Sequence, residues 1–237
     1  MEVLLSDKYQ VKGMNPDSKN KNAFKLQVRE LRLRQIEQIS LKDVVSRMKG
    51  NFRFNMFKKF VDQFETNRPF KGVNYDVGHN ERVSLVAYYL ANELCLTNLE
   101  LKIVLASAFY YDLGNDGEIL DGNYGKKSAE RVSELDLGFK DEDMRLLTAI
   151  LTCQTLRTAN FERVLDKNGI DNIEQFKNLL NVLKDSIELD NVRLLDSKIN
   201  PSKLKNKDSR ELIVASYQLY ENYQQIQEEL LSGSKEC

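Results

Sequence analysis

Apolar residues in the middle of the chain recur with a helical period. In residues 79–95 they return every three or four positions, which predicts an amphipathic helix with one buried face. The next segment, 98–112, is apolar nearly all round after its first turn, so we expect it to be the most enclosed helix. The same kind of periodicity predicts three further helices, at 126–137, 141–156 and 171–195.

The two ends of the chain carry amphipathic patterns as well. Residues Asn22–Met48 predict one helix with a break near Ser40. In Asn51–Asn67 phenylalanines and lysines fall on opposite helical faces. This pattern occurs in nucleic-acid platforms, but a core helix with a solvated basic back explains it better, so nucleic acid is not an expected partner. Apolar positions in 208–231 follow a 4-3-4-3-4 spacing, which fits either self-association through a coiled-coil seam or docking along a groove of the same chain.

Composition favours the same all-helical architecture, and no strand is predicted. The 237 residues include only 3 prolines and 11 glycines, with 41% apolar and 30% charged residues, as in a globular protein built of long helices. The net charge of -1 gives no general attraction to nucleic acid or to anionic membranes. No apolar run is long enough to span a membrane and no signal peptide is evident. We therefore expect a cytoplasmic protein without membrane contact, although non-classical secretion stays open. The three cysteines form no close pair, and their odd number argues against a disulfide framework.

The candidate chemistry centres on the only histidine of the sequence. His79 begins the 79–95 helix, and Asp112 ends the apolar helix that follows. A histidine and a carboxylate on adjacent buried helices are typical of a hydrolytic metal site, in which open coordination positions take water and phosphate. Taken alone, the same two residues also fit a hydrogen-bonded core histidine and a helix-end carboxylate.

Four segments together resemble a known family. HNERV (79–83), YDLG (111–114), YGKKSA (124–129) and KDSIELDNVRLL (184–195) are similar, in order and spacing, to the motifs of the HD superfamily of metal-dependent phosphohydrolases. The resemblance implies an all-α, HD-domain-like helical bundle, here with helical extensions at both ends. We accordingly expect an N-terminal extension at 1–72, the HD-like domain at 73–200, and a C-terminal amphipathic helix and tail at 201–237.

In that family a histidine, a His-Asp pair and a later aspartate hold the divalent ion that activates water. The resemblance assigns His79 to the first histidine and Asp112 to the aspartate of the pair. Tyr111 stands in place of the paired histidine, and Tyr124 stands where many relatives have a histidine for a second metal. At the last metal aspartate the comparison places Ile187, which also continues the apolar stripe of its helix.

The missing ligands predict a degenerate member of the family, a pseudo-phosphohydrolase. Asp190, three residues after Ile187, replaces the last aspartate only if the alignment shifts. With two of four ligands left we expect neither hydrolysis nor a resident cofactor, and we expect His79 to hydrogen-bond to Asp112. The pocket is then expected to bind a nucleotide or another phosphate-containing molecule through five residues: Arg82, Tyr111, Tyr124, Lys126 and Lys127.

Two other functions stay open at this point. The first is a residual metal-dependent phosphohydrolase or phosphodiesterase with a reduced Mg²⁺ or Mn²⁺ site. Its ligands would be His79 and Asp112 with either Asp190 or a loop acid, Asp116 or Glu118. The second is an interaction protein that uses its terminal amphipathic helices to bind a protein partner or a second copy of itself.

Overall fold

A computed structural model of the chain describes residues 18–66, 77–115, 123–194 and 198–231. These residues form α-helices and two short 3-10 helices, and none of them lies in a strand, which confirms the all-α prediction. In chain order the elements are α2 (Ser18–Leu33), α3 (Leu41–Gly50), α4 (Phe54–Thr66), α5 (Val77–Glu93), α6 (Asn98–Tyr110), α7 (Tyr124–Val132), α8 (Asp141–Cys153), η2 (Thr158–Asn160), α9 (Phe161–Asn168), α10 (Ile173–Asp190), η3 (Asn191–Arg193), α11 (Lys207–Glu211), α12 (Ile213–Glu221) and α13 (Tyr223–Leu231).

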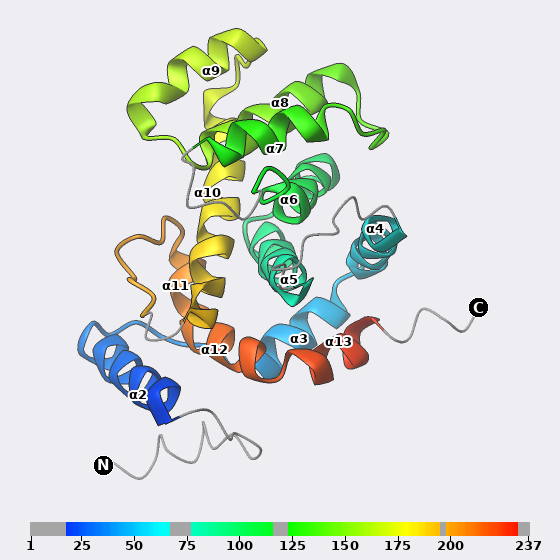
Figure 1. Cartoon of the computed structure of the whole chain (residues 1–237). Helices are drawn as coiled ribbons and strands as arrows, with labels where there is room; N and C mark the ends of the chain where they lie inside the picture. The colour runs from blue at the N-terminus through cyan, green and yellow to red at the C-terminus, as the bar shows by residue number, and fades with distance from the viewer. Residues whose placement is uncertain (1–17, 67–76, 116–122, 195–197, 232–237) are drawn as a thin grey trace.

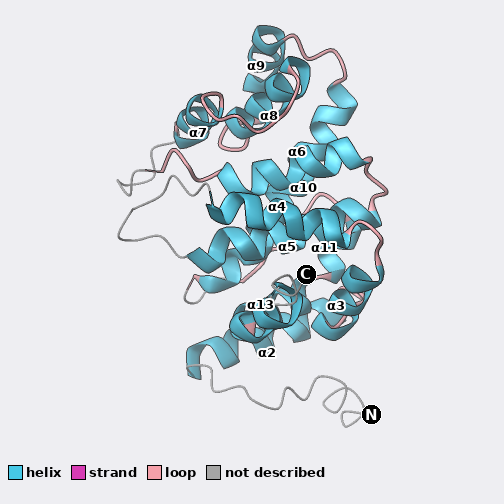
Figure 2. Cartoon of the chain, turned by 90° about the vertical axis from the view of Figure 1, so that its right-hand side faces the viewer, coloured by secondary structure: helices cyan, strands magenta, loops and turns pink. Residues whose placement is uncertain are grey.

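Three helices, α5, α6 and α10, form the centre of the molecule (Figures 1 and 2). Every residue of α6 from Ile103 to Tyr110 is buried, as expected for the most enclosed helix. The start of α6 is fixed by a capping box, in which Thr97 and Glu100 each bond the backbone N–H of the other. The helix α10 packs along both α5 and α6, and this arrangement brings its C-terminal end to the first turn of α5.

Helices α7, α8 and α9 cover one end of this centre, in the upper part of Figure 1. The helices α7 and α8 approach closely because Gly125 has no side chain: a Cβ there would lie 2.6 Å from the carbonyl oxygen of Leu151. The helix α7 ends at Val132 rather than at residue 137 as predicted. Gly138, with a φ of 67°, belongs to the turn that leads into α8 and not to the end of α7.

The N-terminal region contains the predicted break. Ser40 is the N-cap of α3 and accepts a hydrogen bond from the backbone N–H of Asp43 at 3.2 Å. In α4 the side chains of Phe57 and Val61 are buried and Lys59 is exposed, so this segment is a core helix with a basic outer side.

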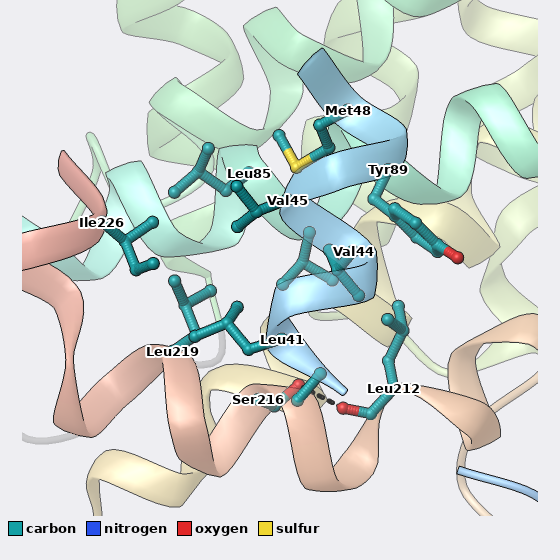
Figure 3. A pocket seen from close by; sticks show the side chains of 12 residues that line it. Leu41, Val44, Val45, Met48, Leu85, Tyr89, Leu212, Ser216, Leu219 and Ile226 are labelled. Carbon is teal, nitrogen blue, oxygen red and sulfur yellow. Dashed lines mark hydrogen bonds between the residues drawn. The ribbon is translucent and has the colours of Figure 1, made fainter. Parts of the chain in front are cut away.

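The predicted C-terminal helix is divided into three shorter helices, α11, α12 and α13. Leu212, Leu219 and Ile226 of its apolar stripe lie against α3 and α5 of the same chain, near Val45 and Leu85 (Figure 3). Packing along this seam is nearly complete, since the remaining cavity is about 20 Å³. The stripe is thus used inside the chain, and self-association through this segment stays a prediction.

A buried carboxylate connects α10 to the segment that leads into α11. Asp185 is 1% exposed and accepts hydrogen bonds from the backbone N–H groups of Lys205 and Asn206, each at 2.9 Å. The hydroxyl of Ser209 donates another at 2.7 Å, and the side-chain amide of Asn206 one at 2.9 Å. The negative charge is therefore balanced by backbone and side-chain dipoles, and it holds the start of the C-terminal region against α10.

One hydrophobic cluster includes residues from each of the three predicted segments, among them Phe57, Leu105 and Leu219. The domain boundaries at residues 72 and 200 stay predictions. Among the described helices, none combines the length and the hydropathy that crossing a bilayer requires.

Candidate functional site

His79 lies in the first turn of α5 and is 5% exposed. Its Nδ1 atom is hydrogen-bonded to a carboxylate oxygen of Asp190, at the end of α10, and its Nε2 atom to the hydroxyl of Tyr111. Because a carboxylate only accepts, Nδ1 carries the hydrogen, and in the neutral ring Nε2 accepts the hydroxyl hydrogen of Tyr111. Both ring nitrogens are therefore engaged by protein groups.

Asp190 is the charged centre of this group of residues. It is 4% exposed, and Arg82 binds it with two nitrogens, Nε to Oδ1 at 2.6 Å and Nη2 to Oδ2 at 3.1 Å. Arg193 approaches from η3, with its Nε 3.8 Å from Oδ2 of Asp190 and its Nη2 3.4 Å from Nε2 of His79. We call His79, Arg82, Tyr111, Asp190 and Arg193 the His79 cluster.

Two tyrosines from the C-terminal helices cover Arg82. The guanidinium carbon lies 5.1 Å from the ring centre of Tyr220 and 5.3 Å from that of Tyr223, distances typical of cation–π contacts. Gly78 makes this packing possible, because a Cβ there would lie 2.8 Å from Nη1 of Arg82 and 3.0 Å from Cε1 of Tyr223. The C-terminal region is thus packed directly onto the buried ion pair.

The turn that carries Tyr111 is fixed by residues of two other helices. The hydroxyl of Ser128 in α7 donates to the carbonyl oxygen of Tyr111 at 2.8 Å and accepts from the backbone N–H of Gly114 at 2.7 Å. The side-chain amide of Gln154 also donates to the carbonyl oxygen of Tyr111, at 2.5 Å. A side chain at position 114 would collide with α7, since its Cβ would lie 2.4 Å from the carbonyl oxygen of Tyr124. The YDLG and YGKKSA segments are therefore in direct contact.

Asp112 lies beside the His79 cluster and is half-buried. Burial raises the pKa of its carboxyl group, while a hydrogen bond with Asn115 and the fields of His79 and Arg193 act in the opposite direction. Burial also raises the pKa of the phenol of Tyr124, and the carboxylate of Asp112 raises it further. Asp112 therefore lies within electrostatic range of both His79 and Tyr124.

The expected hydrogen bond between His79 and Asp112 is wrong, because the carboxylate on Nδ1 of His79 belongs to Asp190. The cause is the end of α10, where the residue that faces His79 is Asp190 and not Ile187. Ile187, one helical turn earlier, is half-buried and packs against the hydrophobic core.

The five residues expected to bind a phosphate ligand do not gather at one place. Arg82 and Tyr111 belong to the His79 cluster, and Tyr124 lies near Asp112. The ammonium group of Lys126 lies 3.7 Å from Glu130 on an exposed side of α7, in a cleft between α7, α8 and α9. Lys127 is half-buried, and its Cβ lies where a side chain at position 114 would collide with it.

Among the described residues, no three histidine, cysteine, aspartate or glutamate side chains lie close enough together to hold a metal ion. His79, Asp112 and Asp190 are all described, whereas Asp116 and Glu118 lie outside the described residues. What the described residues form instead is a network of ion pairs and hydrogen bonds.

Sequence reasoning missed three residues of this region. Arg193 had a local signal, since it follows Asp190 by three residues and so lies on the same side of a helical turn. Tyr220 and Tyr223 had none, because their place over Arg82 results from the way α12 and α13 return to α5.

Comparisons with known proteins add no assignment. No protein-family model, no curated protein and no solved structure matches the chain.

Proposed function

We propose that this chain is a helical protein of HD-like descent that acts by binding, and that its former metal centre has become a structural ion-pair cluster. The observation that carries the proposal is the engagement of both ring nitrogens of His79, by Asp190 and by Tyr111. A histidine binds a metal through a nitrogen lone pair. In the His79 cluster, Nδ1 is a donor and the lone pair of Nε2 is taken by the tyrosine hydroxyl, so a metal has to displace a buried hydrogen bond.

The positive charges around Asp190 also disfavour a metal ion at the His79 cluster. Two guanidinium groups, those of Arg82 and Arg193, lie around the carboxylate that a cation would need. A divalent ion on Nε2 of His79 would stand near Nη2 of Arg193, which is 3.4 Å from that nitrogen. Two unit charges at ~4 Å interact by about 4 kcal/mol at an effective dielectric constant of ~20, and an ion with two charges feels twice that. The arginines therefore favour the cluster without a metal.

The ordered convergence of the four motif segments supports HD-like descent. His79 and Arg82 come from HNERV, Tyr111 from YDLG, and Asp190 from the last segment. The third segment, YGKKSA, contributes Ser128, which positions Tyr111. Segments separated by more than a hundred residues thus meet around one histidine.

Metal analysis tests the proposal directly. Protein purified without chelator is analysed for metal content, and turnover of a bis(nitrophenyl) phosphodiester is measured with added Mn²⁺. We expect far less than one metal ion per chain and no turnover above the protein-free rate. One ion per chain that is lost in the His79→Ala variant would overturn the proposal.

A residual phosphohydrolase is the second candidate, and one observation favours it. Asp112 is a half-buried carboxylate within the field of His79, so a movement of Tyr111 would free Nε2 of His79 for an ion near Asp112. If this candidate holds, Mn²⁺-dependent phosphodiester turnover is measurable and Asp112→Asn abolishes it. Turnover that is unchanged by Asp112→Asn points to a contaminating enzyme and removes the candidate.

A further inference from the structure

A separate cleft lies at the other end of the α5–α6 hairpin from His79. It has a volume of about 570 Å³, within the range of small-molecule sites. Its walls are one face of α4, the first turns of α6 and the 137–143 segment that leads into α8. Tyr111 follows Lys102, which lines this cleft, by nine residues, or roughly 13 Å of helix rise, so the cleft and the His79 cluster are distinct.

Three lysines from three different elements line the cleft: Lys59 of α4, Lys102 of α6 and Lys140, the N-cap of α8. All three are exposed, and within the described part of the chain no ion pair or hydrogen bond occupies their ammonium groups. The only carboxylate in the lining is that of Asp143, which is buried. The side chains that line the cleft thus carry three positive charges and one negative charge, a balance that favours a multiply charged anion there.

The remaining wall of the cleft is apolar and partly aromatic. Phe60 and Phe139 pack against the core with one side and line the cleft with the other. Met56 does the same, and Leu99 is 43% exposed at the rim. The combination of this apolar wall with three lysines favours a ligand site over a surface that serves only solubility. A flat, poorly hydrated ring would cover this wall, and aromatic side chains bind such rings by stacking or edge contacts.

The face of α4 that lines the cleft also carries a row of polar side chains beside its apolar ones. Asn55, Lys59 and Gln63 follow one another at i, i+4 and i+8, and Met56 and Phe60 form the adjacent row. The helix therefore offers side-chain amides and an ammonium group on one row and apolar contacts on the other. A ligand that carries ring nitrogens, a flat ring and a polyanionic chain matches all three.

We propose that this cleft binds a nucleoside polyphosphate. Its base lies against Phe60 and Phe139, and its phosphates are held by Lys59, Lys102 and Lys140. The site is independent of the function proposed for the His79 cluster, because it shares no residue with that cluster and requires no metal ligand from it.

Calorimetric titration of the full chain tests the proposal. The probes are the four ribonucleoside triphosphates, with inorganic tripolyphosphate as the probe that lacks a base. We expect at least one nucleoside triphosphate to bind more tightly than tripolyphosphate, and we expect this binding to weaken as salt is added. No measurable binding of any triphosphate up to millimolar concentration overturns the proposal. Equal binding of tripolyphosphate would show that the base makes no contact with the cleft, and this result overturns the proposal as well.

Variants locate the site. Lys102→Glu and Lys140→Glu change exposed side chains, so the fold is retained, and each is expected to weaken binding at least tenfold. Lys25→Glu is the matched control, because it makes the same change of charge on the exposed side of α2, and it is expected to leave binding within twofold. Phe139→Ala is expected to weaken nucleoside triphosphate binding and leave tripolyphosphate binding unchanged. Equal losses in the lysine variants and in the Lys25→Glu control mean a non-specific charge effect, which rules out the cleft.

Discussion

The hydroxyl of Tyr111 and the Nε2 atom of His79 share one hydrogen bond between the end of α6 and the start of α5. If the proposed HD-like descent holds, the two helices that this bond joins are those that carried the first metal ligands. Since Nδ1 of His79 is bonded to Asp190, the imidazole connects α5, α10 and the end of α6. The hydroxyl of Tyr111 therefore helps to fix these helices to one another.

Replacement of Tyr111 by histidine is expected to open Nε2 of His79 to a metal ion, against the repulsion of Arg193. The variant removes the hydroxyl from Nε2 of His79 and places a second imidazole at the position before Asp112. We expect Mn²⁺ or Zn²⁺ to raise the thermal unfolding midpoint of Tyr111→His by several degrees, since a ligand that binds only the folded state stabilises it. The midpoint of the original chain is expected to change by less than the error of the measurement.

Tyr110→His is the control for this experiment. It introduces the same side chain at a buried position one residue earlier, away from the hydrogen bond to His79. Equal metal stabilisation of Tyr110→His and Tyr111→His would mean that any added histidine binds the ion, and the idea of a restorable centre would fail.

Asp190→Asn is expected to be strongly destabilising. The change removes the carboxylate that binds the guanidinium of Arg82, which is 3% exposed. Breaking a buried pair from one side typically costs about 3–5 kcal/mol. Urea unfolding measures this loss, and in the double variant with Arg82→Met the loss is expected to be smaller than in Asp190→Asn alone. Equal losses in the single and double variants would show that Arg82 and Asp190 are not energetically coupled.

The contrast between Ile187 and Asp190 shows where sequence reasoning stopped. The period of the apolar residues placed α5, α6, α8 and α10 correctly, because burial of one face depends on local spacing alone. Which residue at the end of α10 faces His79 depends on how far α10 extends along α5, and that register is set by packing between helices. Ile187, where the resemblance places the last metal aspartate, therefore lies one helical turn before the carboxylate that faces His79.

The C-terminal region shows the same division between local and tertiary information. The stripe of Leu212, Leu219 and Ile226 was evident from its spacing, and these side chains are buried. The spacing did not reveal the interruptions between α11, α12 and α13, nor the contact of Tyr220 and Tyr223 with Arg82. Both arise from the path of the chain around α3 and α5.

Asp112→Asn is expected to make stability less sensitive to pH. Burial raises the pKa of this carboxyl group in the folded chain, so the charged form is disfavoured by folding. Below the ordinary pKa of an aspartate the group is protonated in both states, and its contribution to stability is fully present. As the pH rises through the raised pKa of the folded state, that contribution is lost. The asparagine variant, which has no charge to bury, should therefore gain stability relative to the original chain as the pH rises from acidic to neutral.

Urea unfolding of both proteins across this pH range checks the sign. Asp166→Asn, at an exposed position of α9, is the control and should show no comparable trend. A relative stability of Asp112→Asn that falls as the pH rises would mean that the fields of His79 and Arg193 outweigh burial.

Asp185→Asn is expected to loosen the C-terminal region from α10. The carboxylate accepts from the backbone of Lys205 and Asn206 and from the hydroxyl of Ser209, so an amide nitrogen in its place faces donors and leaves some of them unpaired. The expected cost is on the order of 3 kcal/mol, because a hydrogen-bonded buried charge is lost. Ser209→Ala removes only one of these bonds and is expected to cost about 1 kcal/mol. Hydrogen exchange distinguishes the mechanisms: the amides of Lys205 and Asn206 should lose protection far more than those of α6, whereas a uniform loss along the chain would contradict a local role for Asp185.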